Sequence, residues 1–292
     1  MKDLIIVTGG AGFIGSNLIQ LLLKKTNYKI YSIDNYSTGE KKNHIIDKRV
    51  KYIKEHTKNI SKVLNSKKKQ IKVIFHFGEF ARIYQSFSSM NECIDSNSVG
   101  SHEVFNFCFD NKIKLIYSAT SASIGNNGKD KNLSPYAFTK AKNLELLENY
   151  KKWFGLKFEI IYFYNVYGPK QIKSGKMATV IGIFEDQYKK NKYLTVVKPG
   201  TQTRRFTHVS DTINACYLAF KKNKNRHYSI SHKKSYSILQ VAKMFGHKIK
   251  FLPNRSGERY ASALTNMNLS NKVYKLYGKI ELKNYIKSIK NK

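Results

Sequence analysis

A tyrosine and a lysine stand four residues apart in the stretch "SPYAFTK", residues 134–140. Ser134 can cap a helix with Pro135 in its first turn, so Tyr136 and Lys140 are expected on the same helix face. Free tyrosine has a pKa of about 10, but an ammonium beside it stabilises the phenolate and lowers that pKa. The spacing predicts a proton-handling pair, although it also fits a surface Tyr and Lys on an amphipathic helix.

The hydroxyl residues that precede this helix favour the proton-handling interpretation. An apolar run ends in "IYSATSASIG", residues 116–125. Ligands of parallel α/β sheets bind at the carboxyl ends of the strands. We therefore expect Thr120 at such an end, where its hydroxyl would hold a substrate hydroxyl against Tyr136.

The loop "TGGAGFIG", residues 8–15, carries glycines at every third position, Gly9, Gly12 and Gly15. Glycines let the backbone turn tightly and approach a pyrophosphate, which binds the free N–H groups of the following helix. Asp34 ends the next apolar run about 20 residues later, where a carboxylate binds an adenosine ribose and repels a 2′-phosphate. The pattern predicts NAD rather than NADP, and its alternative is a glycine-rich turn followed by an ordinary aspartate.

The elements that must position these residues alternate in type along the first half of the chain. The strand-like apolar runs are residues 3–10, 28–35, 71–78, 112–120 and 158–168, and the helical patterns are 16–25, 97–111 and a run that starts at 134. This alternation predicts an α/β fold with a Rossmann-like, doubly wound parallel sheet.

The second half of the chain has a less regular pattern. Its helical stretches are residues 179–190, 209–222 and 237–246. We predict an NAD-binding Rossmann domain over 1–167 that also receives part of 206–232. A smaller, mixed substrate-binding domain is predicted over 168–292.

The net charge of +34 would attract an anionic partner. The excess is almost all lysine, spread along the chain with Asn, Ile and Tyr, as AT-rich codons would produce. The sequence has no RRM, KH, helix-turn-helix or zinc-finger pattern, so nucleic acid binding is disfavoured. Arginine is rarer, and four of the seven arginines fall in two short motifs, which predicts phosphate or carboxylate binding there by Arg204, Arg205, Arg255 and Arg259.

The three cysteines, Cys93, Cys108 and Cys216, lie far apart and show no C-x-x-C spacing. The spacing suggests neither a zinc site nor a disulfide framework. No apolar run reaches the length of a membrane span. We expect a soluble cytoplasmic protein that is not secreted and holds no metal.

Together these motifs resemble the extended short-chain dehydrogenase/reductase family, and within it the nucleotide-sugar epimerases similar to UDP-glucose 4-epimerase. The resemblance spans nearly all of the chain and rests on "TGGAGFIG", "IDNYSTG", "FHFGEF", "NSVG", "SATSASIG", "SPYAFTK", "YNVYGP", "TRRFTHVSD" and "RSGE", in family order. It implies an NAD-dependent isomerase that epimerises UDP-hexose or UDP-N-acetylhexosamine through a transient 4-keto sugar.

The resemblance also implies roles for individual residues. The implied catalytic residues are Thr120, Tyr136 and Lys140. The implied NAD contacts are Gly9, Gly12, Phe13, Ile14, Gly15, Asp34, Asn35, Ser37, Tyr136 and Lys140. The implied substrate contacts are Asn165, Arg204 and Arg255 at the nucleotide diphosphate, and Ser262 beside a 2-acetamido group. Family relatives dimerise through helices that match residues 97–109 and 136–154, so a homodimer is implied as well.

The chain departs from the family pattern at several positions. Glu55 and His56 stand where relatives usually carry Gly-Asp, which puts the usual contact to the adenine amine in doubt. Ile124 replaces an aromatic residue, and Gly78 and Glu79 stand where small residues are common. These changes concern the pocket rather than the core chemistry.

Two other functional classes stay open. One is another enzyme of this family, a dehydratase or reductase acting on nucleotide-sugars. Dehydratases of the family place Asp-Glu directly after the Thr and decarboxylating relatives keep the Glu, whereas this chain has Ser121 and Ala122. The other is a non-catalytic NAD-sensing or nucleic-acid-binding protein, which the presence of all three catalytic residues disfavours.

Overall fold

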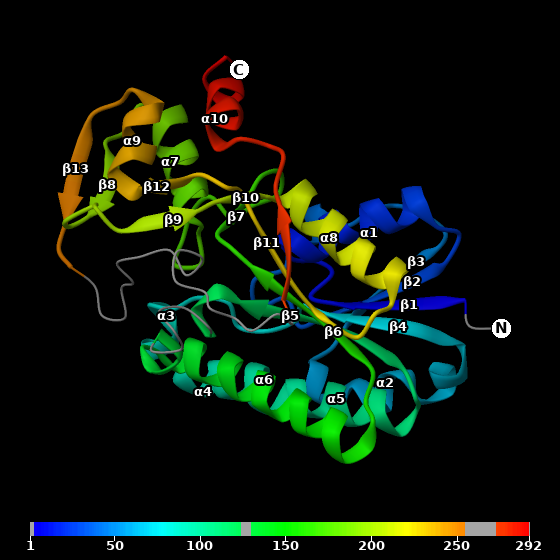
Figure 1. Ribbon diagram of the computed structural model, residues 1–292. Coiled ribbons are helices and arrows are strands. Elements are labelled where there is room, and N and C mark those ends of the chain that lie inside the picture. Colours follow the sequence, from blue (N-terminus) through cyan, green and yellow to red (C-terminus); the bar gives the residue numbers. More distant parts are fainter. Residues whose placement is uncertain (1–2, 124–129, 255–272, 292) are drawn as a thin grey trace.

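The structure is a computed structural model and describes residues 3–123, 130–254 and 273–291. Its centre is an eight-stranded sheet in which all neighbouring strands run parallel (Figure 1). Across the sheet, the strands are β14 (Val273–Tyr277), β11 (His227–Ser231), β6 (Phe158–Phe163), β5 (Lys114–Thr120), β4 (Ile71–His76), β1 (Leu4–Thr8), β2 (Lys29–Asp34) and β3 (Val50–Lys54). The predicted doubly wound parallel sheet is confirmed.

The central strands are apolar along their whole length because both faces of the sheet are covered. β1, "LIIVT", is buried at all five residues, and β4, "IKVIFH", is buried except at Lys72. A strand covered on one face alone would alternate apolar and polar side chains. These strands therefore appear in the sequence as continuous apolar runs.

Helices pack on both faces of the sheet (Figure 1). One face carries α1 (Phe13–Lys25) and α8 (Val209–Lys222), which pack against each other. The other face carries α2 (Ile60–Leu64), α5 (Ser101–Asp110) and α6 (Pro135–Phe154), with the short helices α3 (Gln85–Ser88) and α4 (Met90–Ile94) beside α6. Short 3-10 segments are Lys41–Asn43, Thr57–Asn59, Asn65–Gln70 and Ser121–Ser123, and a π-helical segment, Asp95–Gly100, leads into α5.

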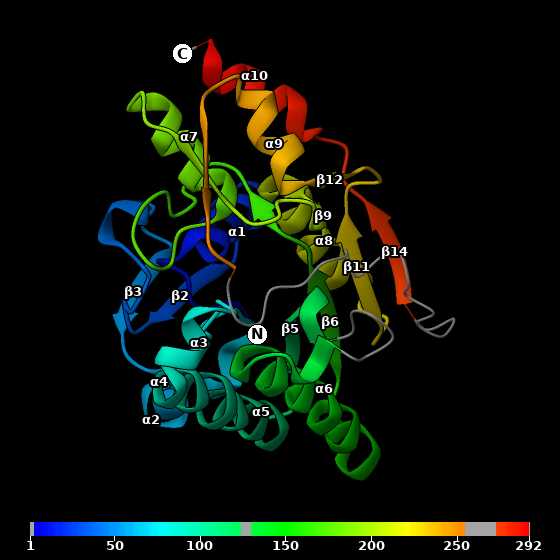
Figure 2. The same ribbon diagram turned by 90° about the vertical axis from the view of Figure 1, so that its left-hand side faces the viewer.

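A second, smaller core lies beside the carboxyl ends of the strands (Figures 1 and 2). Phe184, Val196, Val241, Phe245 and Ile286 are buried in it. Its helices are α7 (Val180–Lys189), α9 (Ile238–Phe245) and α10 (Leu282–Lys290), and its paired strands are β8 (Leu194–Val197) with β13 (Ile249–Leu252) and β9 (Thr203–Arg205) with β12 (Ser235–Ser237). The pair β7 (Val166–Tyr167) and β10 (Thr207–His208) lies where the chain passes between the two cores.

The chain returns from the second core to the large sheet. α8 packs on α1, and β11 pairs with β6, so residues from 206–232 join the sheet. β14 adds a further strand from residues 273–277, which sequence analysis had not identified. The division of the chain into domains at 167 and 168 stays a prediction.

Large apolar side chains are exposed on the helical face that carries α4 and α6. Phe138 and Trp153 on α6 are 45% and 58% exposed, and Met90 on α4 is 50% exposed. Leu144 and Leu147, on the same helix α6, are instead buried against the sheet. Apolar side chains gathered on one exposed face are typical of a surface that another protein covers.

We predict that two copies of the chain associate through this face. Light scattering at micromolar concentration should give twice the 33.8 kDa mass of one chain. Phe138→Lys should shift the mass to that of the monomer, because it places a charge in the apolar contact. Phe251→Lys is the matched control, since Phe251 on β13 is equally exposed but lies outside this face. A monomeric mass for the unmodified protein would contradict the prediction.

Candidate active site

The glycine loop connects β1 to α1 and requires glycine at two positions. Gly9 has φ of +69°, and a Cβ there would lie 2.8 Å from the carbonyl carbon of Phe77. A Cβ on Gly15 would overlap the carbonyl oxygen of Gly9. Gly12 is the N-cap of α1, which begins with Phe13 and has no side-chain cap. Free N–H groups at a helix N-terminus beside a loop without side chains fit a pyrophosphate.

Asp34 ends β2 and points back at this loop. Its carboxylate accepts hydrogen bonds from the backbone N–H of Ala11 at 2.9 Å and of Tyr36 at 2.8 Å. Burial raises the pKa of Asp34, and these two hydrogen bonds act in the opposite direction. An ionised carboxylate has four lone-pair sites, so Asp34 keeps capacity for the hydroxyls of a ribose. The geometry fits the NAD-binding role that the sequence predicts.

The turn after Asp34 and the end of β3 complete this edge of the sheet. Asn35 Oδ1 accepts a hydrogen bond from the N–H of Ser37 at 3.0 Å, and both residues are exposed. Glu55 accepts hydrogen bonds from the N–H of His56 and from the Asn59 side chain. The carboxylate of Glu55 is thus used within its own turn, which explains how this departure from the family pattern is accommodated.

Thr120 and Tyr136 meet at the carboxyl edge of the sheet. Thr120 is the last residue of β5. Tyr136 lies in the first turn of α6, where Ser134 Oγ accepts a hydrogen bond from the N–H of Ala137 at 3.1 Å and Pro135 is the first residue. The Thr120 side chain lies close enough to the Tyr136 hydroxyl to lower its pKa. The structure therefore brings together two of the three predicted catalytic residues through their hydroxyl groups.

The pKa of Tyr136 is raised to about 12, not lowered as the sequence spacing had suggested. Burial is the largest cause, and the charge of Glu79 also raises the pKa. The side chain of Thr120 and the charge of Arg82 lower the pKa of Tyr136. Lys140 is not among these causes, which follows from where its ammonium is bound.

Lys140 is buried one turn after Tyr136, and its ammonium is directed into the protein. It forms an ion pair with Glu79, donates a hydrogen bond to the carbonyl of Ser118 and lies 3.4 Å from the hydroxyl of Tyr117. Burial lowers the pKa of Lys140, while Glu79 raises it. The prediction that Lys140 shares a helix face with Tyr136 is compatible with this arrangement, but its charge is balanced by Glu79.

Arg82 belongs to the site although sequence analysis did not single it out. Its guanidinium donates to the carbonyl of Met177, with 2.8 Å from Nε to the oxygen, and to that of Ala81. The bond to Met177 connects the segment after β4 to the chain that leads into α7. The scarcity of arginine in this lysine-rich chain is the sequence signal that could have identified Arg82.

The predicted substrate contacts are only partly covered by the described residues. Asn165, which follows β6, has φ of +39° and donates from its side chain to the carbonyl of Arg205 at 2.9 Å. Arg204 lies beside Arg205 in β9 and donates to the carbonyl of Thr203. Asn165 and the arginine motif are therefore adjacent. The predicted contacts Arg255 and Ser262, and the departure at Ile124, lie outside the described residues.

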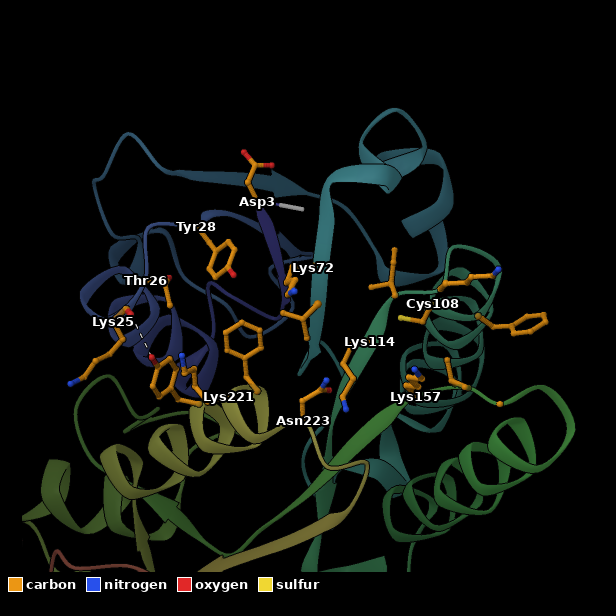
Figure 3. A pocket seen from close by; sticks show the side chains of 18 of the residues that line it. Asp3, Lys25, Thr26, Tyr28, Lys72, Cys108, Lys114, Lys157, Lys221 and Asn223 are labelled. Atoms are coloured by element: carbon orange, nitrogen blue, oxygen red, sulfur yellow. Dashed lines mark hydrogen bonds between the residues drawn. The ribbon is translucent and has the colours of Figure 1, made fainter. Parts of the chain in front are cut away.

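A cavity of about 1330 Å³ lies at the opposite edge of the sheet (Figure 3). Its lining includes residues at the amino ends of the parallel strands, such as Asp3, Tyr28, Lys72, Lys114 and Lys157. Thr120 and Asp34 end their strands, so this cavity is separated from them by the length of the sheet. It contains no predicted site residue.

The part of the chain that the structure describes contains neither a metal-ligand cluster nor a membrane-spanning helix. Among residues 3–123, 130–254 and 273–291, no group of three or more His, Cys, Asp or Glu side chains is arranged to hold a metal ion. Within those ranges there is also no helix with the length and hydropathy needed to cross a bilayer.

Known proteins of similar sequence act on nucleotide-sugars. A protein of Methanocaldococcus jannaschii, named provisionally as a UDP-glucose 4-epimerase, is 29% identical over 85% of this chain and 83% of its own length. The UDP-N-acetyl-alpha-D-glucosaminuronate decarboxylase of Bacillus cytotoxicus is 28% identical over 83% of this chain and 79% of its own. Relatives therefore include enzymes of more than one reaction type.

Solved structures of nucleotide-sugar epimerases share the fold. The UDP-glucuronic acid 4-epimerase of Bacillus cereus, solved with UDP-glucuronic acid and NAD, is 26% identical, with a TM-score of 0.83 and coverage of 99% of this chain and 98% of its own. A model of the NAD dependent epimerase/dehydratase family matches residues 5–231. With a glycine loop and an acidic strand end that fit NAD, the chain belongs to this family of NAD-dependent nucleotide-sugar enzymes.

Proposed function

We propose that this protein is a UDP-sugar 4-epimerase, with Tyr136 as the proton acceptor and donor. The observation that carries the proposal is that Thr120, the last residue of β5, and Tyr136, in the first turn of α6, bring their side chains together at the carboxyl edge of the sheet, the edge that also holds the glycine loop. Ligands of open parallel sheets bind at this edge. The proposed substrates are UDP-hexose and UDP-N-acetylhexosamine.

The proposed mechanism assigns one role to each catalytic residue. Tyr136 Oη takes the proton of the sugar 4-hydroxyl when C4 is oxidised and returns it after the 4-keto sugar has turned over. Thr120 holds the 4-oxygen against Tyr136. NAD, held by the glycine loop, would supply the hydride acceptor and donor that the reaction at C4 needs. Lys140 would hold the nicotinamide ribose.

The remaining predicted residues would bind the two nucleotides. Backbone groups from Gly9 to Gly15, with Phe13 and Ile14, would hold the pyrophosphate of NAD, while Asp34, Asn35 and Ser37 would contact its adenosine ribose. Asn165, Arg204 and Arg255 would hold the diphosphate of the sugar nucleotide. Arg204 and Arg255 come from the two arginine motifs, and a planar guanidinium suits phosphate oxygens.

The surroundings of Tyr136 favour epimerisation over elimination or loss of carbon dioxide. Ala122 is 1% exposed and packs in an apolar cluster with Tyr136, Phe80 and Cys93. Family dehydratases and decarboxylases carry a Glu at the position of Ala122. Without that carboxylate, Tyr136 and Thr120 are equipped to remove and return one proton at the sugar, which is what epimerisation at C4 requires.

The role of Tyr136 predicts a selective loss of turnover. Tyr136→Phe keeps the ring that packs with Ala122 but removes the proton acceptor, so conversion of UDP-glucose or UDP-N-acetylglucosamine should fall about 100- to 10,000-fold. NAD should still bind in a direct titration. Tyr193→Phe removes a hydroxyl from an exposed ring far from the site and should leave turnover unchanged. Near-normal turnover by Tyr136→Phe would rule out the role.

The carboxylate of Asp34 predicts a preference for NAD over NADP. We expect NAD to bind at least about tenfold more tightly, a difference of about 1.4 kcal/mol. Asp34→Asn should reduce the difference in affinity between NAD and NADP, because it removes the charge that repels a 2′-phosphate. Asp47→Asn is the control, since Asp47 pairs with Arg49 away from the loop. Equal or tighter binding of NADP to the unmodified protein would overturn the assignment.

The residue at position 262 predicts which sugars fit. The resemblance places a bulky aromatic side chain there in enzymes that exclude a 2-acetamido group, so Ser262 should admit N-acetylhexosamine nucleotides. Ser262→Tyr should suppress turnover of UDP-N-acetylglucosamine far more than turnover of UDP-glucose, because a steric clash excludes a substrate outright. Ser288→Tyr, on the exposed face of α10, serves as control. An equal loss with both substrates would contradict this role.

A further inference from the structure

Glu79 is a buried carboxylate whose hydrogen bonds converge from several elements. Its side chain is 2% exposed. Three groups donate to Oε1: the hydroxyl of Ser101 at 2.8 Å, the hydroxyl of Tyr117 at 2.9 Å and the side-chain amide of Asn143 at 3.2 Å. Oε2 forms the ion pair with Lys140. One carboxylate oxygen of Glu79 therefore accepts hydrogen bonds from neutral groups, and the other pairs with the lysine.

This arrangement fixes the segment after β4 to the elements around the site. Ser101 begins α5, Tyr117 lies in β5, and Asn143 and Lys140 lie on α6. Burying a carboxylate is costly unless it is paired and hydrogen-bonded, and Glu79 is both. The chain has only 19 acidic residues against 53 basic ones, so a glutamate kept at this buried position is not explained by composition.

The ammonium of Lys140 has three N–H groups, and the protein supplies three acceptors for them. They are Glu79, the carbonyl of Ser118 and the hydroxyl of Tyr117, which at 3.4 Å is a longer contact. The ammonium also lies 4.6 Å from the centre of the Tyr117 ring. Glu79 and Ser118 thus orient the Lys140 ammonium. The contact to Tyr117 is the longest of the three, so it is the one that a ligand can replace at the smallest cost in free energy.

We propose that Glu79 is a positioning residue for the reaction proposed above, because its carboxylate holds the Lys140 ammonium against the Ser118 carbonyl and balances its charge beside Tyr136. The inference rests on the proposed function for the role of Lys140. With Lys140 balanced, Arg82 is left as the cation that favours the Tyr136 phenolate. Lys140 then serves binding and orientation.

The titratable groups that face Lys140 come from β4 and the residues after it, from α4 and from β5. They are His76 at the end of β4, Glu79 just after it, Cys93 of α4 and Tyr117 of β5. His76 is buried, and burial lowers its pKa to about 4, so it is neutral near pH 7. Burial also raises the pKa of the Cys93 thiol, which is therefore neutral as well. Glu79 is the partner that raises the pKa of Lys140 against the effect of burial.

Glu79→Gln tests the inference at the level of single atoms. The amide oxygen can still accept from Ser101, Tyr117 and Asn143, while the amide N–H₂ faces the ammonium of Lys140, donor against donor. NMR of protein labelled at lysine Cε should then show the Lys140 signal, assigned by its absence in Lys140→Met, titrating at least about one pH unit lower than in the unmodified protein. An unchanged midpoint would overturn the inference.

Two further variants separate charge from packing. Glu79→Asp keeps the carboxylate and should bring the Lys140 midpoint back toward that of the unmodified protein. Ser101→Ala removes one hydrogen bond to Glu79 but no charge, and should leave the midpoint in place. A shift in Ser101→Ala as large as in Glu79→Gln would show that loosened packing is the cause and would refute the inference.

Turnover supplies a second, independent readout. In Glu79→Gln the conversion of UDP-sugars should fall about tenfold or more, and the alkaline side of its pH–rate profile should move to lower pH with the Lys140 midpoint. A profile that does not move would count against the inference. If the unmodified protein converts none of the UDP-sugars, the proposed function fails, but the lysine titration still decides whether Glu79 holds the charge of Lys140.

Discussion

A parallel sheet that is buried on both faces leaves few places for polar chemistry, and this constraint determines where the site lies. Helices α1 and α8 on one face, and α5 and α6 on the other, exclude water from the strands. Polar groups are tolerated where the strands end and the backbone turns into loops and helices. Asp34 and Thr120 are both the last residues of their strands, and the glycine loop follows directly on the first. The position of the candidate site thus follows first from the topology of the strands and only then from particular side chains.

At that edge of the sheet, burial disfavours the ionised form of Tyr136, and two neighbouring side chains act against this effect. Burial raises the pKa of Tyr136 to about 12, so the phenolate is scarce near pH 7. The side chain of Thr120 and the charge of Arg82 lower the pKa of Tyr136 against the effect of burial, whereas Glu79, which binds Lys140, raises it. An Arg is suited to remain charged in such surroundings, since its ordinary pKa lies far above that of lysine. The charge of Lys140 is thus paired with Glu79, while that of Arg82 favours the Tyr136 phenolate.

The sequence predicts the parts of this site that depend on local spacing, and it misses those that depend on contacts between distant segments. The glycine loop, Asp34 and the cap at Ser134 each follow from neighbouring residues, and each lies where it was expected. Glu79 and Lys140 are 61 residues apart in the sequence, so only the order of strands β1, β4 and β5 brings them together. β14 was missed for a different reason, because an edge strand with exposed side chains shows no continuous apolar run.

The excess of lysine over acidic residues also affects how buried charges are paired in the interior. Three glutamate side chains that are at most 5% exposed, Glu79, Glu159 and Glu185, each form an ion pair with a lysine: Lys140, Lys114 and Lys173. In a chain with this excess of lysine a buried carboxylate readily finds a cation, but a buried lysine finds few carboxylates. Mutual repulsion of surface lysines destabilises the compact state, and an unpaired ammonium in the interior would add a desolvation cost. Glu79 therefore matters more to this protein than a buried glutamate would in a chain of balanced charge, since few other acidic residues are available to pair with Lys140.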